Sequence, residues 1–292
     1  MAALSLLFAC TPKERPIAPA AVAVPVAAPA KPVAAPTTAQ KVDAILMKAV
    51  FGKEYRPATG DALTMLPDSD PDHRKVLSRF VVSPVANMVL KSGETVLVAN
   101  AEMADDKGEA SSGHPSPGLL NVFVLRQADG KWTVLKRHEN VDTLGSDGHF
   151  GDVSWPVVGP ARQGMAVMSG SSGGGSSSQS ISLYDITGGD LRPLTPSMIT
   201  VSGGNEGDCD KELSGNCASV TGKWSFAEPK AAGDYSDLMI AFTGEESKQP
   251  GDDERKPTGP RVVTKKINST ARYAFDGKQY QLVDGTNPVP EF

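Results

Sequence analysis

The pattern of apolar and polar positions predicts one amphipathic helix near the N-terminus of this chain. Apolar residues recur at helical spacing and form a single stripe, which consists of Val42, Ile45, Leu46, Ala49 and Val50. Thr38 is a suitable N-cap and Gly52 is a suitable stop, so the helix is expected between them. We expect its apolar stripe to pack against a β region rather than to bind a partner.

Beyond residue 75 the chain reads as short runs of high β propensity separated by turn-forming residues. The expected strands are 76–83, 88–91, 95–101, 119–126, 132–137, 165–169, 181–186, 198–202, 218–226, 238–242, 262–267, 272–275 and 279–283. Pro84 and Ser92-Gly93 are expected to interrupt the first three. Asp129-Gly130 and Asp276-Gly277 mark hairpins, because both residue types tolerate positive φ. The pattern predicts a mainly β domain, with the helix packed on a multi-stranded antiparallel sandwich or barrel-like fold.

Two further segments are expected to lie outside regular strands. The glycine- and serine-rich tract that begins at Gly170 is interpreted as a flexible connector, and the charged stretch Gly244–Pro260 as a mobile loop. The similar strings at 129–132, 221–224 and 276–278 are interpreted as turns, because their spacings share no repeat period.

The first forty residues differ in composition from the rest of the chain. Residues 1–9 form a short apolar run, which we interpret as a signal segment. Residues 11–40 contain ten alanines and seven prolines, and the prolines forbid a continuous helix. Such a segment favours an extended, semi-rigid spacer. The predicted organisation is therefore a signal segment at 1–9, a tether at 10–40 and a single mainly β domain at 41–292.

The tetrad Leu7-Phe8-Ala9-Cys10 resembles the lipobox of bacterial lipoproteins. The resemblance implies that Cys10 is lipid-modified and becomes the mature N-terminus, so that the protein contacts a membrane through its acyl chains. Thr11 replaces the aspartate that commonly retains such proteins in the inner membrane. The implied location is the outer membrane, facing the periplasm. The run departs from the usual signal in having no basic residue before Lys13.

Charge narrows the class of partner. The formal net charge of the chain is −5, and the tether is slightly basic, so the folded region carries the acidic excess. Nucleic-acid binding depends on Lys and Arg against phosphate, and an acidic domain lacks that electrostatic footprint. We therefore exclude nucleic acid. The location that the lipobox resemblance implies favours an envelope protein or a glycan as the partner.

Two cysteines remain if Cys10 is acylated. Cys209 and Cys217 form an even pair, and an oxidising periplasm would join them in a disulfide. A redox or metal role is the alternative, but the pair has neither C-x-x-C spacing nor a nearby histidine.

The densest group of polar side chains lies between residues 138 and 155. The ligand-binding candidates there are His138, Asp142, Asp147, His149, Asp152 and Trp155. Glycines are interleaved with them and let a loop bend close to a ligand. Two imidazoles and several carboxylates suit a divalent cation or acid–base chemistry. Solvated turns between strands have the same composition, so both interpretations stay open. No catalytic residue is assigned, and no cofactor is predicted beyond the option of this cation.

Known catalytic templates fit the chain poorly. Gly170–Gly174 matches G-x-S-x-G, but all four histidines precede Ser172, which excludes the hydrolase order of the triad. The chain contains neither S-x-x-K nor H-E-x-x-H.

The sequence favours a lipid-anchored envelope protein with a non-catalytic binding or assembly role. The alternatives are a periplasmic metal-assisted hydrolase that uses residues 138–155, and an inhibitor or immunity-type lipoprotein that inserts a loop into its target.

Overall fold

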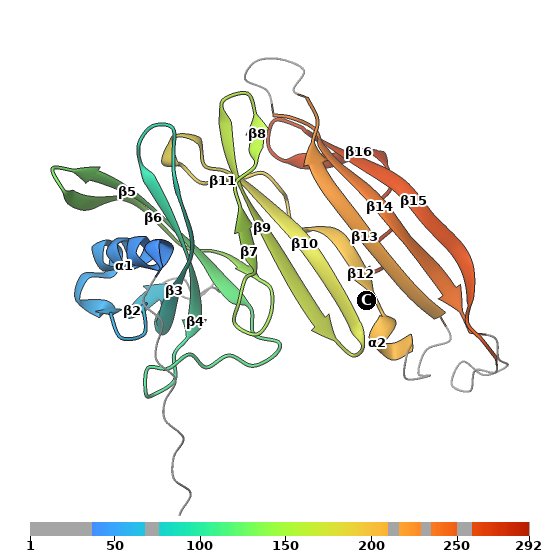
Figure 1. Ribbon diagram of the computed structural model, residues 1–292, viewed down its shortest axis with the longest axis horizontal. Helices are drawn as coiled ribbons and strands as arrows, with labels where there is room; N and C mark the ends of the chain where they lie inside the picture. Colours follow the sequence, from blue (N-terminus) through green and yellow to red (C-terminus); the bar gives the residue numbers. More distant parts are fainter. Residues whose placement is uncertain (1–36, 68–75, 210–215, 229–234, 250–258, 292) are drawn as a thin grey trace, which may run out of the picture. The chain divides into compact units, whose positions relative to one another are not determined.

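Figure 1 shows a computed structural model of the chain. It describes residues 37–67, 76–209, 216–228, 235–249 and 259–291. The predicted signal segment 1–9, Cys10 and the tether as far as residue 36 lie outside the described residues, as do residues 250–258 of the predicted loop Gly244–Pro260. The first part of that loop, 244–248, is strand, so the prediction is wrong there. None of the described helices is both long enough and apolar enough to cross a membrane.

Helix α1 (Thr38–Phe51) begins one residue earlier than the sequence predicts. Its N-cap is Thr37, because Gln40 closes a capping box around that residue. The Thr37 amide donates to Gln40 Oε1 at 2.8 Å, and the Gln40 amide donates to Thr37 Oγ1 at 3.3 Å. The helix ends at Gly52, as predicted, with a φ of 57° and the amide of Gly52 donating to the Lys48 carbonyl. The first helical residues thus fall within the segment assigned to the tether.

Strands β1 to β6 form one antiparallel meander in chain order. They are β1 (Tyr55–Arg56), β2 (Asp61–Pro67), β3 (Leu77–Val89), β4 (Thr95–Met103), β5 (Gly118–Ala128) and β6 (Lys131–Leu144), with the 3-10 turn η1 (Gly52–Glu54) before them. Asp129 and Gly130 both have positive φ in the two-residue β5–β6 turn, so that hairpin prediction is confirmed.

Strand β3 continues through Pro84, so the predicted break there is wrong. Pro84 is paired with Ala99 of β4, and the register shifts between Pro84 and Ala86, which makes Val85 an extra residue on β3. A strand tolerates proline at such a bulge, because the hydrogen-bond ladder is already interrupted there.

The remaining strands form a second antiparallel sheet, in the order β16-β15-β14-β13-β12-β10-β9-β7, with β11 beside β10 and β8 beside β9. They are β7 (Asp152–Ser154), β8 (Val157–Gly159), β9 (Arg162–Gly173), β10 (Ser176–Asp185), β11 (Arg192–Pro193), β12 (Ile199–Gly204), β13 (Asn216–Phe226), β14 (Leu238–Lys248), β15 (Val262–Phe275) and β16 (Tyr280–Gly285), with the short helices η2 (Thr187–Gly189) and α2 (Glu206–Cys209). Neither sheet closes into a barrel. The second sheet approaches closure at one end, where the Tyr280 amide donates to the Leu194 carbonyl at 2.7 Å.

The glycine- and serine-rich tract is not a flexible connector, as the sequence predicts, but the tip of the β9–β10 hairpin. Ser172 pairs with Ser177, and Ser171 pairs with Ser178. Gly174 and Gly175 supply the two positive φ angles, 55° and 84°, that a tight hairpin turn needs. Because β12 also pairs with β10 along this tract, the tip belongs to the sheet rather than to a loop.

The strand expected at 218–226 is confirmed as part of β13, and the interpretation of 221–224 as a turn is therefore wrong. Thr221 pairs with Thr243, and Gly222 pairs with Phe242, both on β14. A Cβ atom on Gly222 would collide with the Val201 carbonyl oxygen of β12 and would lie 2.9 Å from the Phe242 ring. Glycine is required here because the backbones of β12 and β13 approach each other closely, and not because the chain turns.

Three apolar clusters hold these layers together. The first lies between α1 and one face of the meander, and includes Leu46, Met47, Phe51, Leu97, Ala99 and Phe123. The second lies on one face of the second sheet and includes Ile181, Leu183, Val201, Ile240, Phe242 and Tyr273. The third joins the two sheets, and includes Val96, Val98, Leu120, Val122, Met165, Val167 and Tyr184.

Strand β4 contributes to two of these clusters. Leu97 and Ala99 belong to the cluster beneath α1, whereas Val96 and Val98 belong to the cluster shared by the two sheets. All four side chains are fully buried. Burial on both faces explains why this stretch reads as a continuous apolar run instead of alternating with polar residues.

Candidate functional site

The six candidates between residues 138 and 155 are distributed over three places. His138 and Asp142 lie on β6 and pair with Val122 and Leu120, two members of the cluster between the sheets. Their side chains therefore face the second sheet. The Tyr184 hydroxyl of β10 donates to Asp142 Oδ2 at 2.7 Å. Burial, followed by the negative charge of Asp142, raises the pKa of the Tyr184 phenol.

Asp147 and His149 lie on the loop between β6 and β7, and both side chains are exposed. His149 is 71% exposed, and its Nδ1 lies 3.9 Å from Glu102 Oε1 on β4. Gly148 lies between them, and a Cβ atom there would collide with the Glu102 carboxylate and with Ser112. The glycines of this segment thus let the loop fold closely against β4, as their conformational freedom allows.

The last two candidates lie at the second sheet, in strand β7 and directly after it. Asp152 begins β7 and is exposed, whereas Trp155 is partly buried against the cluster between the sheets. Within the described ranges, no three His, Cys, Asp or Glu side chains are placed to hold a metal ion. The convergence of His149 with two carboxylates, which a metal-assisted hydrolase needs, is therefore not found among these residues.

His114 was not among the candidates, yet it makes a central contact of this region. Its Nδ1 lies 2.9 Å from Asp147 Oδ1, and its Nε2 lies 2.7 Å from the carbonyl oxygen of Ser172. The hydrogen bond with Asp147, and after it the one with the Ser172 carbonyl, raises the pKa of His114. The same hydrogen bond lowers the pKa of Asp147. The partners lie 33 and 58 residues away in sequence, so no local pattern could identify them.

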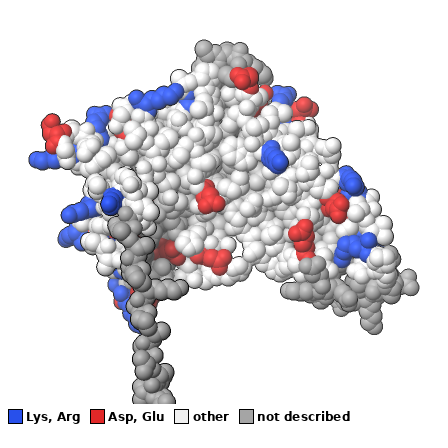
Figure 2. Space-filling view, in the orientation of Figure 1, with Lys and Arg blue, Asp and Glu red and all other residues white. Residues whose placement is uncertain are grey.

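The hairpin tip that His114 contacts lines a polar cavity of about 440 Å³, here called the serine groove. Its hydroxyl-bearing lining residues are Ser146, Ser171, Ser172, Ser177, Ser178, Ser202, Ser219 and Thr221. Several glycines, Gln179, Val220 and Glu206 complete the lining, and Glu206 is the one charged residue among the described residues that form it. Charged side chains are sparse over β9 and β10 on the face shown in Figure 2, and most lie toward its periphery.

Some groove hydroxyls are held by one another. Ser171 Oγ and Ser178 Oγ lie 3.2 Å apart across the hairpin, and Ser202 Oγ donates to Gln179 Oε1 at 3.1 Å. A second cavity, of about 530 Å³, is also lined by Ser171, Ser172, Ser177 and Ser178. Both cavities therefore depend on the position of the same hairpin tip.

A disulfide fixes one end of the serine groove. Cys209 and Cys217 are joined, with their Cα atoms 6.0 Å apart, so this pair adopts the bonded state that the sequence predicts. Asn205 adds side-chain hydrogen bonds to the Asn216 carbonyl at 3.0 Å and from the Ala218 amide at 2.8 Å. The Gly207 amide donates to the Gly175 carbonyl, which places α2 beside the hairpin tip (Figure 1).

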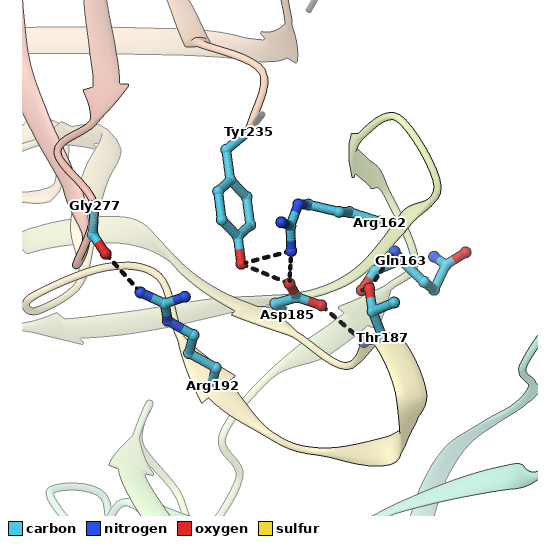
Figure 3. Close-up of polar contacts among 7 residues, drawn as sticks. All are labelled: Arg162, Gln163, Asp185, Thr187, Arg192, Tyr235 and Gly277. Carbon is cyan, nitrogen blue, oxygen red and sulfur yellow. Dashed lines mark hydrogen bonds and ion pairs between the residues drawn. The ribbon is translucent and has the colours of Figure 1, made fainter. Parts of the chain in front are cut away.

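The opposite end of the same hairpin is held by a network around Asp185 (Figure 3). The carboxylate accepts hydrogen bonds from Tyr235 Oη at 2.6 Å, Arg162 Nη1 at 3.2 Å and the Thr187 amide at 2.7 Å. Burial raises the pKa of Asp185, but these hydrogen bonds outweigh it, so the net shift is downward. The Arg162 guanidinium stacks on the Tyr235 ring, 4.4 Å from its centroid.

The chain matches no protein-family model, and no significant match is found among curated proteins or solved structures. Any function must therefore be argued from the groove and from the N-terminal residues themselves.

Proposed function

We propose that this chain is a lipid-anchored protein of the cell envelope, held at the periplasmic side of the outer membrane, with a non-catalytic binding role. The lipobox-like residues 7–10 and the tether that follows them support the anchor. The disulfide between Cys209 and Cys217 supports a location outside the cytoplasm, because disulfides persist in oxidising compartments. In this proposal the two sheets act as a sandwich that supports the serine groove.

The ligand of the groove, in this proposal, is a glycan of the envelope. The observation that carries the proposal is the lining of the groove, in which most side chains are hydroxyls or glycine. Each hydroxyl both donates and accepts hydrogen bonds, and Gln179 adds an amide. A polyhydroxylated, uncharged chain presents the same two kinds of group, so its hydrogen bonds with water are exchanged for equivalent ones.

A protein partner and an apolar small molecule fit the groove less well. Protein interfaces concentrate aromatic and large apolar anchors at their centres, and small-molecule sites are mostly apolar. Val220 is the one large apolar residue among the described residues that line the serine groove, and that lining contains no aromatic side chain.

A steric variant tests glycan binding. Ser177 is exposed and lines both cavities, so Ser177→Trp is expected to weaken binding of an N-acetylglucosamine tetramer at least about tenfold by occupying the site. Nuclear magnetic resonance titration with the tetramer provides the measurement, and wild-type shifts should centre on residues 170–179, 202–204 and 219–221. Ser225→Trp is the matched control, because Ser225 is exposed on β13 outside both cavities.

The glycan proposal fails if the tetramer leaves the groove resonances unchanged, or if Ser177→Trp and Ser225→Trp bind it equally well. A protein that crosslinks to the groove in intact cells, while the tetramer does not bind, would replace the glycan with a protein partner.

The anchor is tested separately in cells. Cys10→Ser should move the protein from the membrane fraction to the soluble periplasmic fraction, because it removes the sulfur that the resemblance assigns to the lipid. Thr11→Asp should keep the lipid and shift the protein toward the inner membrane. Mass spectrometry of native protein gives the deciding measurement, and an unmodified Cys10 contradicts the anchor.

A further inference from the structure

The two contacts of His114 place hydrogen-bond acceptors at both ring nitrogens. Nδ1 faces the Asp147 carboxylate at 2.9 Å, and Nε2 faces the Ser172 carbonyl oxygen at 2.7 Å. Neither partner atom has a proton to donate when Asp147 is ionised. A neutral imidazole carries one N–H group, so one of these two contacts would bring two lone pairs together. Both contacts are satisfied together only by the imidazolium ion.

These contacts join three segments that are far apart in sequence. His114 lies in the connection between β4 and β5, Asp147 in the loop between β6 and β7, and Ser172 at the tip of the β9–β10 hairpin. Two backbone hydrogen bonds already join the first pair, from the Asp147 amide to the His114 carbonyl and from the Gly148 amide to the Ser116 carbonyl. The Nε2 contact extends this assembly to the hairpin tip at 2.7 Å, and a longer hydrogen bond of 3.5 Å runs from Ser146 Oγ to the Gly170 carbonyl.

Few other charges act on this contact. His149, in the same loop as Asp147, adds a weaker electrostatic interaction with that carboxylate, and Glu102 of β4 lies 3.9 Å from the His149 ring. The hairpin contributes no titratable side chain between residues 170 and 179. The state of the contact is therefore determined mainly by His114 and Asp147.

We propose that His114 is a pH-sensitive latch on the serine groove. Its imidazolium form holds the hairpin tip against the loop that carries Asp147, and loss of the proton releases the tip. Because that tip lines both cavities, the latch makes ligand binding depend on pH; this consequence rests on the proposed function of the groove. The device is suited to an envelope protein, whose surroundings follow external pH more closely than the cytoplasm does.

The direction of the pH dependence follows from the two pKa shifts. The pKa of His114 is raised above its ordinary value of 6.5, so the latch is complete below that value and is lost as the pH rises through the raised pKa. The pKa of Asp147 is lowered from 3.8, so its contribution is complete above that value and is lost as the pH falls through the lowered pKa. The latch is strongest between these limits.

Histidine titration and hydrogen exchange test the latch without any ligand. Nuclear magnetic resonance should give His114 a pKa above 6.5 that falls toward 6.5 in Asp147→Asn. Amide protection factors over residues 170–178 should fall about two- to fivefold in His114→Gln, as expected of an exposed charge pair. They should fall similarly in the wild type as the pH rises through the His114 titration. His149→Gln is the matched control, because the His149 ring lies beside Glu102 of β4 and not at the hairpin tip.

Ser172→Ala and His114→Gln together separate this inference from the proposed function. Ser172→Ala removes a groove hydroxyl but keeps the carbonyl that His114 contacts, so it should weaken binding of the N-acetylglucosamine tetramer and leave the His114 pKa unchanged. His114→Gln should abolish the pH dependence of that binding.

A His114 pKa at or below 6.5, or equal hairpin protection in His114→Gln and wild type, overturns the latch. Hairpin protection that follows pH without tetramer binding at any pH supports the latch and overturns the glycan proposal. Tetramer affinity that stays constant while protection changes overturns control of the groove by the latch.

Discussion

Replacing Phe123 with alanine is expected to lower the free energy of unfolding by about 3–5 kcal/mol. Phe123 lies on β5, is fully buried and meets the edge of the Phe51 ring at a centroid distance of 5.4 Å. The Arg137 guanidinium lies 5.0 Å from its centroid. The substitution removes these contacts and leaves a cavity between α1 and the meander, which the surrounding strands can fill only in part.

Chemical denaturation followed by circular dichroism measures this effect. Ile45→Ala on α1 is the control, because Ile45 is 51% exposed, and the free energy of unfolding of this variant should stay within about 0.5 kcal/mol of the wild type. If Phe123→Ala changes stability by less than about 1 kcal/mol, the packing of α1 on the meander described here is incorrect.

Removing the disulfide is expected to have the second largest effect. A double Cys209→Ser, Cys217→Ser variant should lose about 2.5 kcal/mol of stability, because the unfolded chain regains the freedom that the crosslink removes. The loss should also loosen α2 and the adjoining end of the serine groove, since the covalent link to β13 is removed and the hydrogen bonds of Asn205 and Gly207 are left to hold that end to β13 and the hairpin.

Denaturation with and without reductant distinguishes the crosslink from the substitutions. Reduced wild-type protein should match the double variant, whereas the variant itself should not respond to reductant. Equal stability of oxidised and reduced wild type would show that the crosslink contributes nothing to the folded state.

Local patterns in the sequence were sufficient for elements whose signals are local. The helical stripe and Gly52 located α1, and Asp129-Gly130 located the β5–β6 hairpin. Pro84 and the Gly/Ser tract were misinterpreted because both belong to strands for non-local reasons. Pro84 occupies a bulge opposite β4, and the tract is ordered by pairing with β12 as well as with itself.

The candidate site was harder to predict, because its residues meet only in the folded chain. The composition of residues 138–155 indicates a candidate site, and Asp147 of this segment does contact a histidine, His114, which lies outside the segment. Asp142, in contrast, is bound by Tyr184 between the sheets. The groove is built from serines whose sequence resembles a linker, and only the pairing of β9, β10 and β12 brings these residues together.

Strand β4 has a mechanical consequence for the whole described domain. Its alternate side chains pack into two apolar clusters, so displacing β4 would expose both clusters to water. Melting of the helix layer would withdraw the support of the hairpin that carries the groove. The meander and the larger sheet should therefore unfold in a single cooperative transition. A destabilising substitution near α1 would then also destabilise the groove, although it makes no contact with it.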